Sequence, residues 1–442
     1  MAGRHAPLLV PVQSCPYNSN NVPLGLYISV PFCRTKCSYC NFASDVFSKS
    51  AYENYVRRVL EDIANSGVLA CDLGCVFDEH VDSIYLGGGT PSLLDPAQLL
   101  RIFDAVRDQF TVAPGAEITV ECAPGTLTDP LIETLLRAGV NRVSLGVQSF
   151  VDQEAQSVGR LHQRSTVLEE VARLRAAGLH NINIDLIAGL PHQTAESWTY
   201  SLAETVALGA PHASVYMLEV DEDSRLGREL MAGGTRYHAH FVPDDAATAD
   251  FYLQACETLK AAGILQYEIS NFARHDVESG APGDHGFGPQ GWESRHNLKY
   301  WTRQPYFGFG VDAHSMLPAD GAGCQATRFA TPDSLDAYMN RAPHTVTAVS
   351  AWAAIEESFF LGLRLNRGVD LDALRMEFTT DAIAAFDPAL HECLQQELLE
   401  KRGAAVCLTD RGRLLSNEVF ARFLMHEPKP ETTGASTLVT SV

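Results

Sequence analysis

A chain of 442 residues is long enough for two or three domains, and its 46% apolar residues suffice for buried cores. The formal net charge of −21 disfavours a nucleic-acid surface and limits any membrane contact to a peripheral one, because phosphate groups would be repelled over much of the chain. No apolar run reaches the roughly 18 residues of a membrane-spanning helix, and the apolar stretch at the start is too short for a signal peptide. The sequence therefore predicts a protein of the reducing cytoplasm.

The first motif with a chemical meaning is a cysteine triplet. Residues 1–24 are rich in Pro, Asn and Ser and are predicted to form an irregular lead-in. The alternating β-branched run Leu26–Val30 predicts a half-buried strand. The loop after this strand carries Cys33, Cys37 and Cys40 at C-x3-C-x2-C spacing, so three thiolates can converge on one inorganic centre.

Several kinds of centre use clustered cysteines. Structural zinc normally has four ligands, usually in two separated C-x2-C pairs, and the sequence has no second pair at such spacing. The odd total of 11 cysteines disfavours a disulfide framework. Soft thiolates also hold iron–sulfur clusters, and three ligands for four irons would leave one iron open. The spacing favours an iron–sulfur cluster, with a zinc-binding scaffold as the weaker alternative.

Strands and helices alternate from residue 25 to about residue 240. After the first strand, the predicted strands are Val81–Leu86, Glu117–Glu121, Arg142–Val147, Asn181–Ile187 and His212–Leu218. The predicted helices are Lys49–Ser66, Pro96–Phe110, Pro130–Ala138, Ser165–Ala177 and Thr194–Leu208. Six strand–helix units in series predict an α/β fold with a parallel sheet, either a barrel or a doubly wound sheet.

Polar residues cluster where these strands end. Gly87–Thr90 follows the second strand and would let backbone amides approach a ligand. Glu121 and Gln148 follow the third and fourth strands, and Asp185 lies inside the fifth, where a carboxylate is costly unless it is paired. Because the carboxyl ends of barrel strands meet at one face, these residues predict a common site. Helix capping and a tight turn are the alternatives.

The stretch 241–345 is predicted to extend the barrel. It contains a long helix over Asp244–Ala262, a strand over Gln266–Ser270, a Gly/Pro-rich mobile insert at 276–291, and a linker-like passage over Thr331–Val349.

An aromatic and glycine-rich field follows the insert. His296, Tyr300 and Trp301 begin it, and His314 lies a little further on. One histidine in such a field could ligate haem iron while the rings pack on a porphyrin. Composition alone favours the alternative of a satisfied core histidine in an aromatic cluster.

Residues 346–426 are predicted to form a smaller, mostly helical domain. Its predicted elements are helices over Ser350–Leu365, Leu371–Phe378 and Pro388–Lys401, a strand over Ala405–Thr409, and a turn over Asp410–Leu415. Helices that end in a small β-wing predict a winged-helix-like fold. The low positive charge of this domain disfavours DNA binding, so we expect a cover or a partner surface. The Pro/Thr/Ser-rich residues 427–442 predict a disordered tail.

The cysteine triplet, which directly follows a strand and has Tyr39 before its last cysteine, resembles the signature of the radical S-adenosylmethionine (SAM) family. The resemblance implies an open, partial (β/α)6 barrel, a 4Fe–4S cluster on the three cysteines, and SAM chelated by the open iron. It leaves open whether one or two SAM molecules bind. Positions similar to the SAM contacts of coproporphyrinogen-dehydrogenase-like members are Tyr27, Tyr39, Gly88, Gly89, Thr90, Glu121, Gln148, Arg160 and Asp185.

The motif H-N-x-x-Y-W, present here as His296 to Trp301, is similar to that of HemW-type haem chaperones, which are relatives of oxygen-independent coproporphyrinogen III oxidases. The resemblance implies haem contacts at His296, Tyr300 and Trp301, with His314 as the second candidate ligand. Oxidases carry a further cysteine two positions after the third, where this chain has Phe42.

Both features favour a chaperone that binds haem and delivers it to an acceptor protein. The alternative is a radical SAM enzyme that oxidatively decarboxylates coproporphyrinogen III. The resemblance leaves open whether SAM is cleaved, which protein accepts the haem, and whether the chain forms a homodimer.

Overall fold

The computed structural model describes residues 22–275, 291–320 and 324–425. Almost all of the predicted lead-in (residues 1–24) and of the predicted mobile insert (276–291), and the whole predicted tail (427–442), lie outside the described residues.

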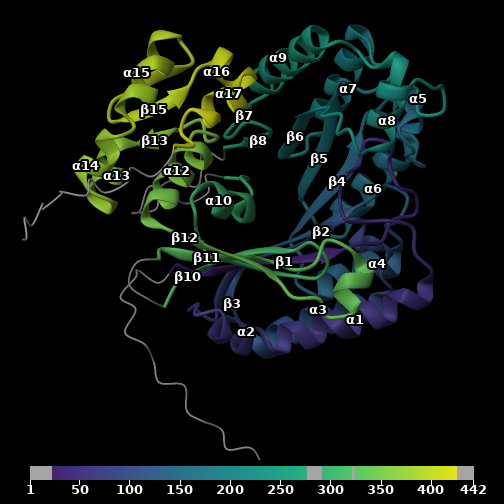
Figure 1. The fold of residues 1–442 in the computed structure, drawn as a ribbon. Coiled ribbons are helices and arrows are strands. Elements are labelled where there is room, and N and C mark those ends of the chain that lie inside the picture. The colour runs from purple at the N-terminus through teal and green to yellow at the C-terminus, as the bar shows by residue number, and fades with distance from the viewer. Residues whose placement is uncertain (1–21, 276–290, 321–323, 426–442) are drawn as a thin grey trace, which may run out of the picture.

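A sheet of twelve strands forms the centre of the molecule (Figure 1). Six of its strands run parallel in chain order: β1 (Leu24–Val30), β2 (His80–Gly88), β3 (Thr111–Cys122), β4 (Arg142–Gln148), β5 (Asn181–Ala188) and β6 (His212–Met217). In the described part of the chain, the outermost strands of the sheet do not pair with each other. The sheet is therefore an open, partial (β/α)6 barrel, as predicted.

Helices cover the outer face of the six parallel strands (Figure 1). They are α1 (Lys49–Ala64), α2 (Ser66–Asp72), α3 (Pro96–Gln109), α4 (Asp129–Arg137), α5 (Asp152–Ser157), α6 (Arg164–Ala176) and α7 (Ala195–Leu208), with a 3-10 turn, η1 (Pro91–Leu93). Leu26, Ile28 and Val30 of β1 are fully buried in the large core that these helices enclose. Burial of both strand faces explains the nearly continuous apolar runs in the sequence.

The chain extends the sheet at both ends. Beyond β6 lie α8 (Arg225–Ala232), η2 (Ala239–Phe241), α9 (Asp245–Ala261) and the antiparallel pair β7 (Ile264–Gln266) and β8 (Asn271–Arg274). After α10 (Arg295–Trp301), β9 (Tyr306–Phe309) pairs in parallel with β1. Strands β10 (His314–Pro318), β11 (Ala326–Ala330) and β12 (Thr345–Val349) continue the sheet in antiparallel order.

Two predictions for this extension were wrong. The strand predicted over Gln266–Ser270 is mainly the turn between β7 and β8, where the Glu268 carboxylate accepts hydrogen bonds from the Ser270 amide and the Asn271 side chain. The passage predicted as a linker contains the helix α11 (Leu335–Met339) and the edge strand β12. The first four residues of β12 are exposed, so burial imposed no apolar alternation on its sequence.

The C-terminal unit has a hydrophobic core of its own, built mainly from residues 355–423. Its helices are α12 (Ala351–Gly362), α13 (Leu371–Glu377), α14 (Thr380–Ala384), α15 (Asp387–Gln395), α16 (Asp410–Leu414) and α17 (Ser416–Ala421). A small antiparallel sheet joins β13 (Val369–Asp370), β15 (Ala405–Leu408) and β14 (Leu399–Arg402). The predicted helical unit with a small wing is therefore present.

Two element boundaries in this unit differ from prediction. The helix predicted over Pro388–Lys401 ends at Gln395, because Glu397 takes a left-handed backbone (φ 56°) and β14 begins two residues later. The turn predicted over Asp410–Leu415 is the short helix α16, whose start is capped by the Thr409 hydroxyl.

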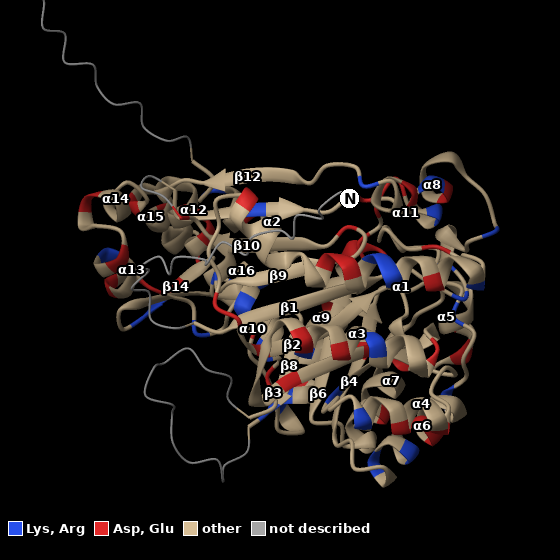
Figure 2. Cartoon of the chain, turned by 90° about the horizontal axis from the view of Figure 1, so that it is seen from below, with Lys and Arg blue, Asp and Glu red and all other residues tan. Residues whose placement is uncertain are grey.

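Charges are mixed on the outer helices. Figure 2 shows Lys and Arg beside Asp and Glu on α1 and α3 rather than in a continuous basic stripe. Within the described ranges, no helix combines the length and the apolar character needed to cross a bilayer.

Candidate functional site

The cysteine loop lies at the carboxyl end of β1 and is fixed by backbone hydrogen bonds from several directions. The Cys33 amide donates to the Asp45 carbonyl oxygen at 3.0 Å, which closes the loop on itself. The Ser38 amide donates to the Val158 carbonyl at 3.1 Å, and the Leu226 amide donates to the Ser38 carbonyl at 2.8 Å. The loop is thus held between the carboxyl end of β1, the segment after α5 and the start of α8.

The three thiols are free and half-buried. Burial raises the pKa of the Cys33 and Cys40 thiols, and the neighbouring cysteines add to the rise. Among the described side chains, no three His, Cys, Asp or Glu groups converge closely enough to hold a metal ion, and this includes the triplet. The donor set is nevertheless the soft thiolate type that suits an iron–sulfur cluster. Cluster binding would need the thiols to turn toward one point and lose their protons.

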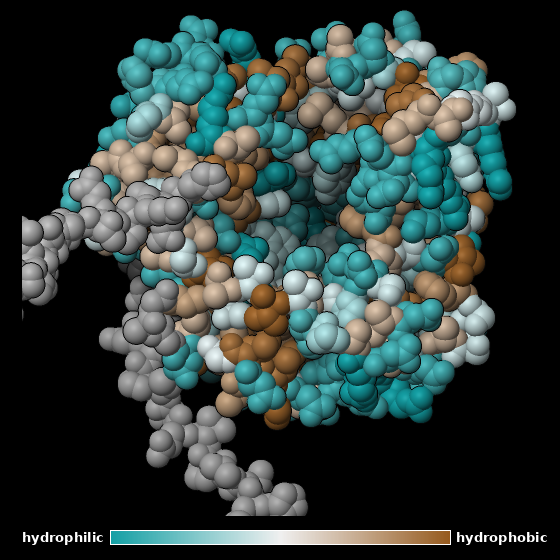
Figure 3. Space-filling model, in the orientation of Figure 1, coloured by the Kyte–Doolittle hydropathy of each residue, from teal (hydrophilic) through white to brown (hydrophobic). Residues whose placement is uncertain are grey.

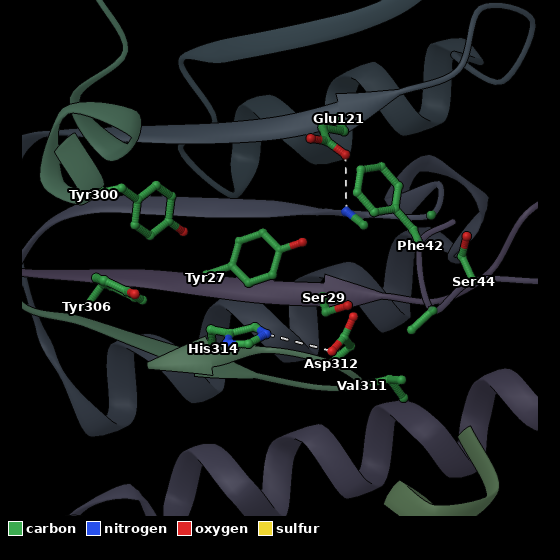
Figure 4. Close-up of a pocket in the computed structure, with 13 residues that line it drawn as sticks. Tyr27, Ser29, Phe42, Ser44, Glu121, Tyr300, Tyr306, Val311, Asp312 and His314 are labelled. Atoms are coloured by element: carbon green, nitrogen blue, oxygen red, sulfur yellow. Dashed lines mark hydrogen bonds and ion pairs between the residues drawn. The ribbon is translucent and has the colours of Figure 1, made fainter. Parts of the chain in front are cut away.

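A cavity of about 350 Å³ opens beside this loop (Figure 4). This volume is at the lower end of the range of ligand sites in proteins, about 300–1,000 Å³. Figure 3 shows that the face in view is hollowed at its centre, between the C-terminal unit and the helices α5 to α8. The cavity is lined by Tyr27, Ser29, Phe42, Ala43, Ser44, Gly88, Gly89, Glu121, Tyr300, Tyr306, Val311, Asp312 and His314. The structure therefore brings four of the predicted SAM contacts together with three residues of the aromatic field, Tyr300, Tyr306 and His314.

The glycines of Gly87–Thr90 are required by close backbone packing. A Cβ on Gly89 would lie 2.8 Å from the carbonyl oxygens of Val30 and Phe32, and Gly88 has a left-handed backbone (φ 99°). The Gly89 amide donates to the Val30 carbonyl at 2.8 Å. This packing holds the β2 terminus against the start of the cysteine loop, where buried Thr90 faces the Cys33 thiol.

Glu121 closes one side of the cavity (Figure 4). Its carboxylate accepts hydrogen bonds from the Tyr85 hydroxyl at 2.8 Å and the Gly88 amide at 3.1 Å. Burial raises the pKa of Glu121 to about 7. Burial and the charge of Glu121 together raise the pKa of Tyr27, which stays a neutral phenol. The carboxyl group can therefore exchange a proton near neutral pH beside a neutral aromatic face.

Tyr39 of the cysteine loop, Gln148 and Arg160 are not part of the cavity wall. The Arg160 guanidinium donates to the Tyr39 hydroxyl at 3.2 Å. Burial lowers the pKa of Arg160, but Tyr39 and Cys37 outweigh it and the pKa is raised overall. Gln148 is buried and has a left-handed backbone (φ 68°). The arrangement gives a permanent cation next to the thiols.

Asp185 lies in the polar interior of the barrel. It accepts hydrogen bonds from the Ser144 hydroxyl at 3.0 Å and the Asn183 amide at 2.6 Å. Burial raises the pKa of Asp185, although these hydrogen bonds oppose the rise. The buried Arg142, which the sequence analysis did not single out, is a further charged neighbour.

The residues of the H-N-x-x-Y-W motif face different surroundings, and only Tyr300 of the three predicted haem contacts lines the cavity. His296 is 1% exposed, and both of its ring nitrogens have partners: Nδ1 lies 3.1 Å from the Ser83 hydroxyl and Nε2 lies 2.8 Å from the Tyr300 hydroxyl. Burial lowers the pKa of His296 to about 3, so its ring is neutral. In this arrangement both ring nitrogens of His296 are engaged by hydroxyl groups of the protein, and its role as a haem ligand stays a prediction.

Trp301 points away from the cavity. Its ring packs with Tyr267, Leu298 and Leu365 and stacks under the Arg364 guanidinium at 4.2 Å. Of the motif's three predicted haem contacts, only Tyr300 lines the cavity.

Sequence reasoning missed several cavity residues. Tyr306 is not one of these, because it belongs to the predicted aromatic field between Trp301 and His314. Ser29 lies one position before Val30 on β1, so strand periodicity could have placed it on the cavity face. Asp312 lies in a turn with no local signal, and only the tertiary fold brings it to the cavity.

Comparison with known proteins places the chain in a defined class. Residues 27–203 match the radical SAM superfamily model, and residues 349–415 match the HemN C-terminal domain model. Among solved structures, coproporphyrinogen III oxidase (HemN) from Escherichia coli, described as a radical SAM enzyme, has a similar fold. The TM-score is 0.74 at 22% identity, over 91% of this chain and 90% of that chain. The fold is thus that of a radical SAM protein.

Curated relatives narrow the assignment. The heme chaperone HemW of Lactococcus lactis is 31% identical over 409 residues, which cover 92% of this chain and 98% of the relative. The heme chaperone HemW of Bacillus subtilis is 32% identical over 90% of this chain and 98% of its own length, and that of Escherichia coli is 31% identical over 91% and 98%. This chain belongs to the HemW family of radical SAM proteins.

Proposed function

We propose that this protein is a haem chaperone, which binds haem in the cavity beside the cysteine loop and passes it to an acceptor protein. The observation that carries the proposal is the similarity to heme chaperones along nearly the whole chain. The aromatic wall of the cavity supports it, because Tyr27, Tyr300 and Tyr306 line one space (Figure 4), with the rings of Tyr300 and Tyr306 edge to face at 89°. Aromatic side chains of this kind can pack on a porphyrin.

The H-N-x-x-Y-W motif contributes indirectly in this proposal. Tyr300 is the member that meets the ligand, and His296 holds the Tyr300 hydroxyl from behind at 2.8 Å. The ring of His296 also lies 5.4 Å from that of Tyr85, whose hydroxyl donates to Glu121. His296 thus supports two tyrosines that shape the cavity.

Cys33, Cys37 and Cys40 would hold a 4Fe–4S cluster, which when bound supplies an open iron for SAM and an electron for radical chemistry. SAM would lie against Tyr27, Gly88, Gly89 and Glu121 on the cavity wall, and its sulfonium is a cation that a carboxylate attracts. Arg160 keeps a positive charge beside the loop, which favours the thiolate forms that ligands require. The remaining predicted SAM contacts do not line the cavity and would support this site from within the protein: Thr90, Gln148, Tyr39 and Asp185.

The alternative function is oxygen-independent coproporphyrinogen III oxidation. The fold cannot choose, since the oxidase shares it. Phe42 favours the chaperone. It is 62% exposed, it lines the cavity, and it stands where the oxidases are expected to have a further cysteine.

A haem titration of the anaerobically reconstituted full-length protein tests the proposal. We expect a saturable change in the haem absorption spectrum at one haem per chain, and transfer of that haem to a haem-free globin. Spectra that rise linearly with added haem, as for non-specific adsorption, would contradict the proposal. Tyr300→Ala should weaken binding, whereas Tyr200→Ala, on the exposed outer side of α7, should not.

A further inference from the structure

The side chain of His314 is exposed, whereas that of His296 is buried. Its side chain is 69% exposed, and it lies on the cavity wall opposite the Glu121 side (Figure 4). Among the described residues, the charged group that faces its ring is Asp312, whose Oδ1 lies 3.8 Å from Nε2. At that distance the contact is electrostatic rather than a hydrogen bond, so the ring keeps a nitrogen available for a ligand.

The segment that carries His314 is rigid. The Val311 amide donates to the Tyr55 hydroxyl at 3.2 Å, and the Ala313 amide donates to the Thr331 hydroxyl at 2.8 Å. His314 itself begins β10 and pairs with Ala330 of β11. These backbone contacts hold the histidine in a defined position and leave its ring nitrogens without a hydrogen-bond partner within the part of the chain that the structure describes.

Asp312 is directed toward His314 by an unusual backbone. Its φ of 54° is left-handed, and its amide donates to the Pro332 carbonyl at 2.9 Å, which fixes that conformation. An L-residue in this region is uncommon, and Asp and Asn accept it more readily than most residues. The turn thus brings a carboxylate to an exposed imidazole at the edge of an aromatic cavity.

We propose that His314 is the axial ligand of haem iron in this cavity, and that Asp312 is a positioning residue that orients the imidazole. This inference rests on the proposed haem-binding function and goes beyond it by naming the ligand. A carboxylate next to a ligating histidine commonly fixes the ring and strengthens the metal bond. Tyr27, Tyr300, Tyr306 and Phe42 line the same cavity as His314.

The test is a titration of ferric haem into the reconstituted full-length protein, with the Soret band and the iron spin state as readouts. We expect His314→Ala to lose the spectrum of imidazole-ligated haem and to bind haem at least about tenfold more weakly. Free imidazole should restore the ligated spectrum. His391→Ala, which removes an exposed histidine of the C-terminal unit, is the matched control and should titrate like the parent.

Asp312→Asn separates the positioning residue from the ligand. It should keep the imidazole-ligated spectrum and weaken haem binding by about tenfold, because the ring loses its charged partner but not its nitrogen. A spectrum of His314→Ala that is identical to the parent's would overturn the assignment while leaving haem binding intact. A parent protein that shows no saturable haem binding would instead overturn the proposed function, and the ligand assignment with it.

Discussion

Two histidines lie near the cavity, and the segments that carry them are built in opposite ways. His296 is inside α10, whose first amides are held by the Glu117 carboxylate, and its ring is buried between Ser83 and Tyr300. His314 stands at the start of β10, on a turn fixed through its backbone, with its ring exposed. The family motif contains the first histidine and not the second.

If His314 is the ligand as proposed, the motif identifies the region of the site and not the ligand itself. A histidine with two hydrogen-bonded nitrogens and a pKa lowered to about 3 by burial contributes to packing and orientation. An exposed histidine on a rigid turn can meet an incoming ligand at little cost in desolvation. Variants of the cysteine loop, of the two histidine segments and of Glu121 test whether the two histidines differ in this way.

Cys33→Ala should abolish the iron–sulfur cluster completely, because only three cysteines are available on the loop and each is needed. Iron and sulfide analysis with the visible spectrum measures the result. Cys71→Ala, which changes an exposed cysteine on α2, should keep full cluster content. If the comparison holds, the two histidine segments stay folded in the cluster-free variant. Unchanged iron and sulfide in Cys33→Ala would rule out the loop as the cluster site.

Gly310→Ala should damage the turn that supports His314. The new Cβ would collide with the Tyr55 hydroxyl and lie 2.6 Å from the Ser29 carbonyl oxygen, in a backbone with φ 95°. We expect the free energy of unfolding to fall by roughly 3–5 kcal/mol, from overpacking and left-handed strain together. Denaturant titration measures the loss. Gly74→Ala is the control, since Gly74 has φ 64° with no atom near its Cβ position. Equal losses in the two variants would mean that the turn is not tightly packed.

His296→Leu should lower the free energy of unfolding by about 2 kcal/mol, because the buried Ser83 and Tyr300 hydroxyls lose their shared partner. The folded variant should still show imidazole-ligated haem, which is the opposite of the result expected for His314→Ala. Denaturant titration and the haem spectrum are read on the same sample. Loss of the ligated spectrum in a folded His296→Leu protein would contradict the assignment of His314 and would indicate that His296 is the haem ligand.

Glu121→Gln should change the pH dependence of stability. The folded pKa of Glu121 is raised from 4.5 to about 7, so its contribution to stability is complete below pH 4.5 and is lost as the pH rises to about 7. Gln cannot ionise, so the variant should gain about 3 kcal/mol over the parent at pH 8 and nothing at pH 4. Unfolding curves at both pH values test this, with Glu133→Gln on the exposed face of α4 as the control. A parent-to-variant difference that is the same at both pH values would contradict the pKa assignment.

Periodicity and turn chemistry were sufficient for most of the barrel. The β1 to β6 strands are buried on both faces, so their residues are strongly constrained, and the helix periods follow from the core that they cover. The exposed β12 carried no such constraint and was misassigned, because packing did not select its residues. The turn at Glu268 was misassigned for a different reason: Tyr267, Glu268 and Ile269 are buried, so their sequence resembles that of a buried strand.

For the site, the sequence identified residue types at strand ends, and the fold brought Tyr27, Gly88, Gly89 and Glu121 to one cavity. It could not show that Tyr300 rather than His296 lines the cavity, because the two residues are one helical turn apart on the same face of α10. Nor could it place Asp312, which reaches His314 only through a left-handed turn. Such features depend on tertiary contacts between distant segments.

The central claim is that this family member holds haem rather than converting its precursor. The most direct measurement is an anaerobic assay of the reconstituted protein with SAM, a reductant and coproporphyrinogen III, beside a haem titration of the same preparation. For a haem chaperone we expect saturable haem binding and no decarboxylated product above one equivalent of protein. Protoporphyrinogen formed over many turnovers would contradict it and would make the protein an oxidase despite Phe42.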